Sequence, residues 1–155
     1  MSEDERDLPA TGRFESGVHL FPLRVYFEDT DLSGIVYHAN YLRFMERARS
    51  DMLRLAGIDQ RAAMEADEGA YAVVDLTIKY RSPARLDDDL VVESTVDEIR
   101  AASCVIHQRV RHGASILADA TVHAALVSRQ GRPLRQPRAW VETFKRLKEG
   151  KNLKP

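Results

Sequence analysis

The sequence predicts an α+β fold in which a long helix packs against one antiparallel sheet. Apolar residues between positions 40 and 55 recur with helical spacing. Four segments between positions 70 and 128 instead alternate with the period of two that is typical of half-buried strands. The elements follow one another as strand, long helix, short helix, four strands and terminal helix, an order that favours helices packed on one face of a sheet.

Composition limits the classes of protein that need to be considered. The chain has 155 residues, of which 44% are hydrophobic and 30% charged, and this suits one globular domain. The net charge of −1 gives no indication of a nucleic-acid partner, and the single cysteine excludes an internal disulfide. The acidic N-terminus is unlike a signal peptide, and no apolar run is long enough to be a transmembrane segment. We therefore expect a cytoplasmic protein.

The polar, aperiodic residues 1–17 are predicted to be a disordered N-terminal tail, 18–149 to be the folded domain, and 150–155 to be a C-terminal tail. The first strand is expected at 18–27, where Pro22 indicates an edge or a bulge.

The long helix is expected to begin at Asn40, a good N-cap residue, and to end at Gly57, a plausible C-cap. Its predicted buried face comprises Tyr41, Phe44, Met45, Ala48, Met52 and Leu55. A shorter helix is expected at 58–67, and Pro137 is well placed to open the terminal helix. Strands are expected around 74–81, 90–97, 103–111 and 115–128, with a turn at His112-Gly113 between the last two.

Three acids fall within four residues just before the long helix: Glu28, Asp29 and Asp31. Such acids repel one another unless solvent, a metal or chemistry compensates them. The helix N-terminus that follows offers unpaired N–H groups and a partial positive charge, which suit a developing oxyanion. The alternative is a solvated turn in which one carboxylate bonds its own backbone.

This stretch resembles a known family. Tyr-Phe-Glu-Asp-Thr-Asp at 26–31, Gly-Ile-Val-Tyr-His-Ala-Asn-Tyr at 34–41, Glu-Arg-Ala-Arg at 46–49 and a second block at 80–88 are similar to the hot-dog-fold thioesterases of the 4-hydroxybenzoyl-CoA type. Within that family the likeness is strongest to the acyl-CoA thioesterases encoded with the bacterial Tol-Pal system. The resemblance implies a hot-dog fold, with the antiparallel sheet wrapped around the long central helix. It also implies a homodimer or homotetramer whose active site lies at the subunit interface.

The resemblance also implies roles for individual residues. Asp31 corresponds to the acid that attacks the thioester carbonyl or activates the water that does. The backbone N–H of His38 corresponds to the oxyanion donor, with its ring as a modulator or a proton shuttle, and Gly34 lets the chain pass close to the substrate. Tyr37 and Asn40 are expected to be pocket or cap residues. The resembled enzymes use no cofactor and no metal.

Three further side chains are candidates for substrate binding. Glu46 is the second carboxylate candidate, because another branch of hot-dog thioesterases places its catalytic acid on the long helix. Its alternatives are an exposed helix acid paired with Arg49 or Ser50, at i+3 and i+4, or a hydrogen bond inside the dimer interface. Arg81 and Arg85 are candidates for the phosphates of coenzyme A, or are ordinary solvated side chains.

Two patterns indicate no chemistry. Cys104 and His107, three apart on a strand, point to opposite faces and cannot form a nucleophile-base pair, so Cys104 is interpreted as a core residue. The remaining histidines lack metal-ligand spacing.

The first functional hypothesis is therefore an acyl-CoA thioesterase. The alternative is a non-catalytic scaffold that binds acyl thioesters or acyl carrier protein, and a hot-dog dehydratase is a third option. Asp31 favours hydrolysis, because a pure binder gains little from an anion beside a thioester. The sequence leaves short-chain, long-chain and aromatic acyl groups open.

Overall fold

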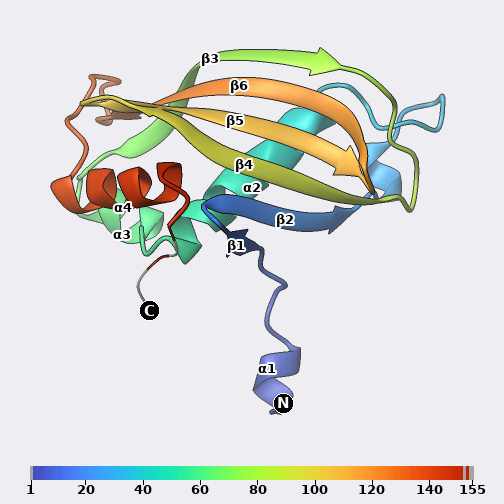
Figure 1. Ribbon diagram of the computed structural model, residues 1–155, viewed down its shortest axis with the longest axis horizontal. Helices are drawn as coiled ribbons and strands as arrows, with labels where there is room; N and C mark the ends of the chain where they lie inside the picture. The colour runs from blue at the N-terminus through green and yellow to red at the C-terminus, as the bar shows by residue number, and fades with distance from the viewer. Residues whose placement is uncertain (1, 152, 154–155) are drawn as a thin grey trace.

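The structure, a computed structural model, describes residues 2–151 and residue 153. A six-stranded antiparallel sheet curves over the central helix α2 (Asn40–Leu55), with the strands in the order β1-β2-β4-β5-β6-β3 (Figure 1). The strands are β1 (Arg13–Glu15), β2 (Val18–Arg24), β3 (Ala70–Tyr80), β4 (Asp89–Ile99), β5 (Ser103–His112) and β6 (Ser115–Val127). The other helices are α1 (Glu3–Arg6), the 3-10 turn η1 (Phe27–Asp29), α3 (Gln60–Glu65) and α4 (Arg138–Lys148). The predicted α+β class is confirmed.

The core lies between α2 and the concave face of the sheet. Phe44, Met45 and Ala48 are almost completely buried against residues of β4 and β6. Alanines at 118 and 120 on β6 leave room for the helix to lie close to the sheet. The predicted buried face of α2 is correct except at Leu55, which is 36% exposed because it lies in the last helical turn.

Buried polar groups tie α2 to the sheet. Gln108 of β5 is completely buried, and its Oε1 accepts a hydrogen bond from Arg49 Nη1 at 2.8 Å. Its Nε2 donates to the carbonyl of Met45 at 3.0 Å and to Ser94 Oγ at 2.9 Å. Each polar atom of this amide is therefore paired, as burial requires.

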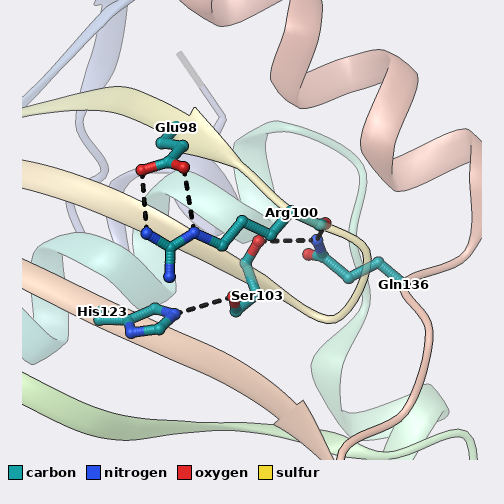
Figure 2. A network of polar contacts seen from close by, with 5 residues as sticks. All are labelled: Glu98, Arg100, Ser103, His123 and Gln136. Atoms are coloured by element: carbon teal, nitrogen blue, oxygen red, sulfur yellow. Dashed lines mark hydrogen bonds and ion pairs between the residues drawn. The ribbon is translucent and has the colours of Figure 1, made fainter.

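A second network fixes the segment that leads into α4. Figure 2 shows Gln136 donating from Nε2 to the carbonyl oxygens of Arg100 and Ser103, at 2.8 and 3.1 Å. The Arg100 guanidinium pairs with both oxygens of Glu98, and His123 Nε2 lies 2.8 Å from Ser103 Oγ. From this anchor on the β4–β5 hairpin, α4 closes one end of the core with Phe144 and Leu147.

The first 17 residues contain more regular structure than the sequence predicts. A short α1 is followed by β1, which pairs with β2 so that Phe14 lies opposite His19. A strand of three residues is too short to show a periodic pattern, which is why it escaped prediction. Beyond the three residues that face β1, β2 is a free edge, and this explains how Pro22 is accommodated there.

The domain limits at 17 and 149 stay predictions. Of the predicted C-terminal tail, residues 152, 154 and 155 lie outside the described residues, and Leu153 packs against the cluster around Phe144. Every helix in the described part of the chain is too short or too polar to cross a bilayer.

Candidate active site

The acidic turn is organised around Asp29, which is only 8% exposed. Its Oδ2 accepts from the backbone N–H of Tyr26 at 2.8 Å, and its Oδ1 accepts from Asn40 Nδ2 at 2.6 Å. Its carbonyl accepts from the N–H of Tyr37 at 2.9 Å. Asp29 therefore has the structural role of a carboxylate that holds a turn together.

The predicted N-cap role of Asn40 is wrong. The capping position is Ala39, which has no side chain to bond the helix, and Asn40 is the first helical residue. The Asn40 amide donates to Asp29 instead of accepting from an N–H of the helix. The N-terminal N–H groups of α2 consequently receive no side-chain cap.

Asp31 is exposed, unlike Asp29. Its Oδ1 accepts hydrogen bonds from both the hydroxyl and the backbone N–H of Ser33, the latter at 2.9 Å. These bonds, with a smaller contribution from the nearby His38, hold the pKa of the Asp31 carboxyl below its usual 3.8. Neither of the two bonds from Ser33 reaches Oδ2. The group is thus an exposed, ionised carboxylate.

The backbone at His38 presents an available donor. The carbonyl of Tyr37 accepts from the N–H of Asn40 at 2.8 Å, and this fixes the peptide that carries the His38 N–H. In the part of the chain that the structure describes, that N–H has no acceptor. An N–H that is fixed but unpaired, at the start of a helix, can stabilise a developing oxyanion.

Gly34 has a φ of +78°, a conformation that side-chain-bearing residues rarely adopt. A Cβ at this position would meet no atom within 4 Å. The backbone conformation of the turn therefore favours glycine here, and crowding by neighbouring residues does not. The space beside Gly34 is open.

A surface hollow adjoins this turn. It is lined by Ile35, Val36, His38, Tyr41, Tyr80, Arg81, Ser82 and Pro83. The structure thus brings His38 and Arg81 together from the two sequence blocks. Arg85 lies beside the hollow, because its backbone bridges to Ile35, whereas Tyr37 is 47% exposed with its ring against His38.

Glu46 is not part of this hollow. It forms an ion pair with Arg49, one of the alternatives that the spacing predicts. Both residues line a separate, mainly apolar cavity between α2, the sheet and α4, with Tyr71, Ile106 and Phe144 among its other walls.

Cys104 and His107 lie on opposite sides of β5, as the sequence predicts. Cys104 is buried in the core, where desolvation raises the pKa of its thiol to about 11, whereas His107 faces outward and pairs with Asp119. Among residues 2–151 and 153, no three His, Cys, Asp or Glu side chains are grouped closely enough to hold a metal ion.

Two residues of the site were missed from the sequence. Ser33 follows Asp31 by two positions, which is the spacing of a local hydroxyl-carboxylate turn and could have indicated the bond. Tyr80 opens the second sequence block, but no pattern in the sequence assigns it a role. Its contact with the turn joins positions 42 residues apart, which no local pattern reveals.

The site and fold can be compared with known proteins. A profile of the Thioesterase superfamily matches residues 33–118. The chain is 41% identical over 129 residues to a Haemophilus influenzae protein named acyl-CoA thioesterase YbgC, an alignment that covers 83% of this chain and 95% of that protein. It is 40% identical over 127 residues to the acyl-CoA thioester hydrolase YbgC of an Escherichia coli O6:H1 strain, covering 81% of this chain and 94% of that one. The crystal structure of a probable thioesterase from Bartonella henselae superposes with a TM-score of 0.74 at 36% identity, over 77% of this chain and 99% of that one.

The curved sheet around a central helix is therefore a hot-dog fold, and the protein is of the thioester hydrolase class. The chain belongs to the Thioesterase superfamily, as the resemblance of its two sequence blocks implied.

Proposed function

We propose that the protein hydrolyses the thioester bond of an acyl-CoA, with Asp31 as the nucleophile or general base. The observation that supports this most strongly is the state of Asp31. Its carboxylate is exposed and ionised, with Oδ2 outside the bonds from Ser33, and it lies on the turn that leads to His38, whose N–H has no acceptor among the described residues. The relatives named acyl-CoA thioesterases support the choice of substrate class.

Two reaction courses fit this carboxylate. In the first, Oδ2 attacks the thioester carbonyl, the carbon–sulfur bond breaks, coenzyme A leaves as a thiolate that takes a proton from solvent, and water then hydrolyses the acyl anhydride on Asp31. In the second, Oδ2 accepts a proton from water as that water attacks the same carbon, the carbon–sulfur bond then breaks, and the departing thiolate takes the proton back from Asp31. Both courses place negative charge on the former carbonyl oxygen, where the His38 N–H would donate to it.

We further propose that coenzyme A phosphates lie near Arg81 and Arg85, which adjoin the hollow beside His38. Acyl carrier protein is a second candidate carrier of the thioester. A homodimer or homotetramer is favoured because β3, a long strand with an unpaired edge, exposes Val73 and Val74. The cytoplasmic location stays a prediction.

The decisive experiment replaces Asp31 by Asn and follows thiol release across acyl-CoA substrates of different chain length. Asp31→Asn keeps the size of the side chain but removes its charge, so kcat/KM should fall by about 10²- to 10⁴-fold. The matched control is Glu28→Gln, because Glu28 is an exposed acid in the same turn. Near-normal turnover by a folded Asp31→Asn protein would overturn the assignment.

A further inference from the structure

We propose that Tyr80 is a positioning residue that holds the oxyanion-binding backbone at His38 in its active orientation. The inference rests on the proposed function and adds a residue to its machinery. The Tyr80 hydroxyl donates to the carbonyl oxygen of His38 at 2.7 Å, so the end of β3 is tied to the turn before α2.

The tie acts on one of the two peptide groups that flank His38. The peptide before it is held from within the turn, because the Tyr37 carbonyl accepts from the Asn40 N–H. The peptide after it carries the His38 carbonyl and the Ala39 N–H. No backbone N–H among the described residues donates to that carbonyl, so the bond from Tyr80 is what fixes this second peptide.

Fixing both peptides matters for the His38 N–H, which belongs to the first of them. The C=O and N–H of a trans peptide point in opposite directions, so holding the His38 carbonyl also directs the Ala39 N–H. The two peptides meet at the Cα of His38. Once both peptide planes are fixed, neither can rotate about that atom, and the direction of the His38 N–H is set. A hydrogen bond to the carbonyl of a peptide also polarises its own N–H, which makes the Ala39 N–H a stronger donor.

Tyr80 is itself well placed for this role. Its ring packs edge-on against Tyr41, with centroids 5.4 Å apart, and against His38 at 6.3 Å. Tyr41 is almost fully buried, and its hydroxyl oxygen accepts from the Ala84 N–H at 3.0 Å, so the surface behind Tyr80 is rigid. Partial desolvation raises the pKa of the Tyr80 phenol, so it remains a hydrogen-bond donor at neutral pH.

The arrangement makes a specific kinetic prediction. A donor that is better oriented toward the oxyanion stabilises the transition state more than the bound substrate, so its loss lowers kcat with little effect on KM. Tyr80→Phe keeps the ring and removes only the hydroxyl. Because a single neutral hydrogen bond is lost, we expect kcat to fall roughly 3- to 10-fold.

The experiment measures thiol release by the full-length protein on the best acyl-CoA substrate, for wild type, Tyr80→Phe, Asp31→Asn and Tyr71→Phe. Tyr71→Phe is the matched control, because it also removes one hydrogen bond of a tyrosine hydroxyl. That bond, from Tyr71 to Gln136 Oε1 at 2.5 Å, does not involve the turn before α2. It should lower the melting temperature without the selective fall in kcat. The amide NMR signals of His38 and Ala39 should shift in Tyr80→Phe and not in Tyr71→Phe.

A rescue variant separates the hydrogen bond from general packing. Replacing Tyr80 by 4-aminophenylalanine keeps a donor at the same ring position and should restore most of the lost kcat. If Tyr80→Phe keeps its kcat within about twofold while Asp31→Asn is inactive, the proposed function stands and Tyr80 has no positioning role. If wild type hydrolyses no acyl-CoA, the proposed function fails and the role of Tyr80 is overturned with it.

Discussion

The side-chain amide of Asn40 donates to Asp29 across 2.6 Å, and this bond joins the acidic turn to the first residue of the central helix. The other oxygen of Asp29 accepts from the Tyr26 N–H. Both oxygens of Asp29 are therefore occupied by protein donors, whereas the two bonds from Ser33 to Asp31, two residues later, both reach the same oxygen. The surroundings of the two acids therefore indicate a structural role for Asp29 and leave Asp31 as the candidate for chemistry.

Asn40→Ala tests the structural role of the hydrogen bond between Asn40 and Asp29. The substitution leaves an oxygen of a largely buried carboxylate without its donor, so the free energy of unfolding should fall by about 1–3 kcal/mol. The turnover should also fall, because Asp31 and His38 lie on the segment that this bond closes. Urea denaturation and thiol release check the two effects. Gln130→Ala removes an exposed amide at a loop and serves as the control; equal stability of the two variants would contradict the role of Asn40.

Much of the fold could be predicted because its elements are long and periodic. Ala118, Ala120 and Val122 alternate along β6, and all three are buried. Hydrogen-bond partners could not be predicted in the same way. An asparagine before an apolar helical run is compatible with a cap or with a distant acceptor, and Asp29, 11 residues earlier, proved to be the acceptor. Likewise, the partners of Gln108 lie on β4 and α2, and only the tertiary fold brings them together.

Ser33→Ala tests how the charge of Asp31 is maintained. Ser33 donates its hydroxyl to Asp31, and this bond is the largest cause of the lowered pKa. The carboxylate is the active form, so activity is present above the pKa and lost as pH falls through it. Removing the hydroxyl should raise that pKa and move the acidic limb of the pH profile of kcat/KM to higher pH. Ser82→Ala, at the rim of the hollow, is the control; an unmoved limb in Ser33→Ala would show that the titration belongs to another group.

Arg81→Ala and Arg85→Ala test the binding of the coenzyme end. A phosphate contact at an exposed rim acts equally on substrate and transition state, so KM should rise while kcat is unchanged. The increase should be modest, about 1.5- to 5-fold, and smaller at high salt, because water and ions screen exposed pairs. Arg81 already lies 3.8 Å from Asp119, so Arg85 should show the larger effect.

A shortened thioester without the nucleotide separates this role from a structural one. It lacks the phosphates, so neither substitution should change its KM. Arg109→Ala, an exposed arginine on the outer face of β5, is the control. If both substitutions leave KM for every acyl-CoA unchanged at low salt, the phosphates bind elsewhere.

His19 makes stability depend on pH. It is completely buried, its Nε2 lies 2.7 Å from Asp51 Oδ2, and its Nδ1 has no hydrogen-bond partner among the described residues. Burial lowers the pKa of His19 below its usual 6.5 and outweighs the opposing effect of Asp51. The unfolded chain therefore binds a proton first as the pH falls below 6.5, and the free energy of unfolding decreases there.

The expected slope is at most about 1.4 kcal/mol per pH unit for this one group. Urea denaturation at about pH 7.5 and about pH 5.5 measures it. His19→Gln should be less stable at the higher pH but should lose less stability between the two conditions than wild type. His112→Gln, at an exposed position, should keep the wild-type difference. An unchanged difference in His19→Gln would assign the pH dependence to other groups.

The exposed edge of β3 predicts self-association. In the part of the chain that the structure describes, this strand of 11 residues pairs with β6 and with no other strand, and it exposes Val73 by 44% and Val74 by 56% at a bulge. Such an edge is normally covered, and a second copy of the same chain would pair with it and bury both valines.

Light scattering should give at least a dimer for wild type, and Val74→Lys should shift the population to monomer, because burying an unpaired ammonium group is unfavourable. Leu8→Lys, at an apolar residue of the N-terminal segment that is even more exposed, at 69%, should leave the mass unchanged. A wild-type protein that is fully active as a monomer would contradict the role of this edge.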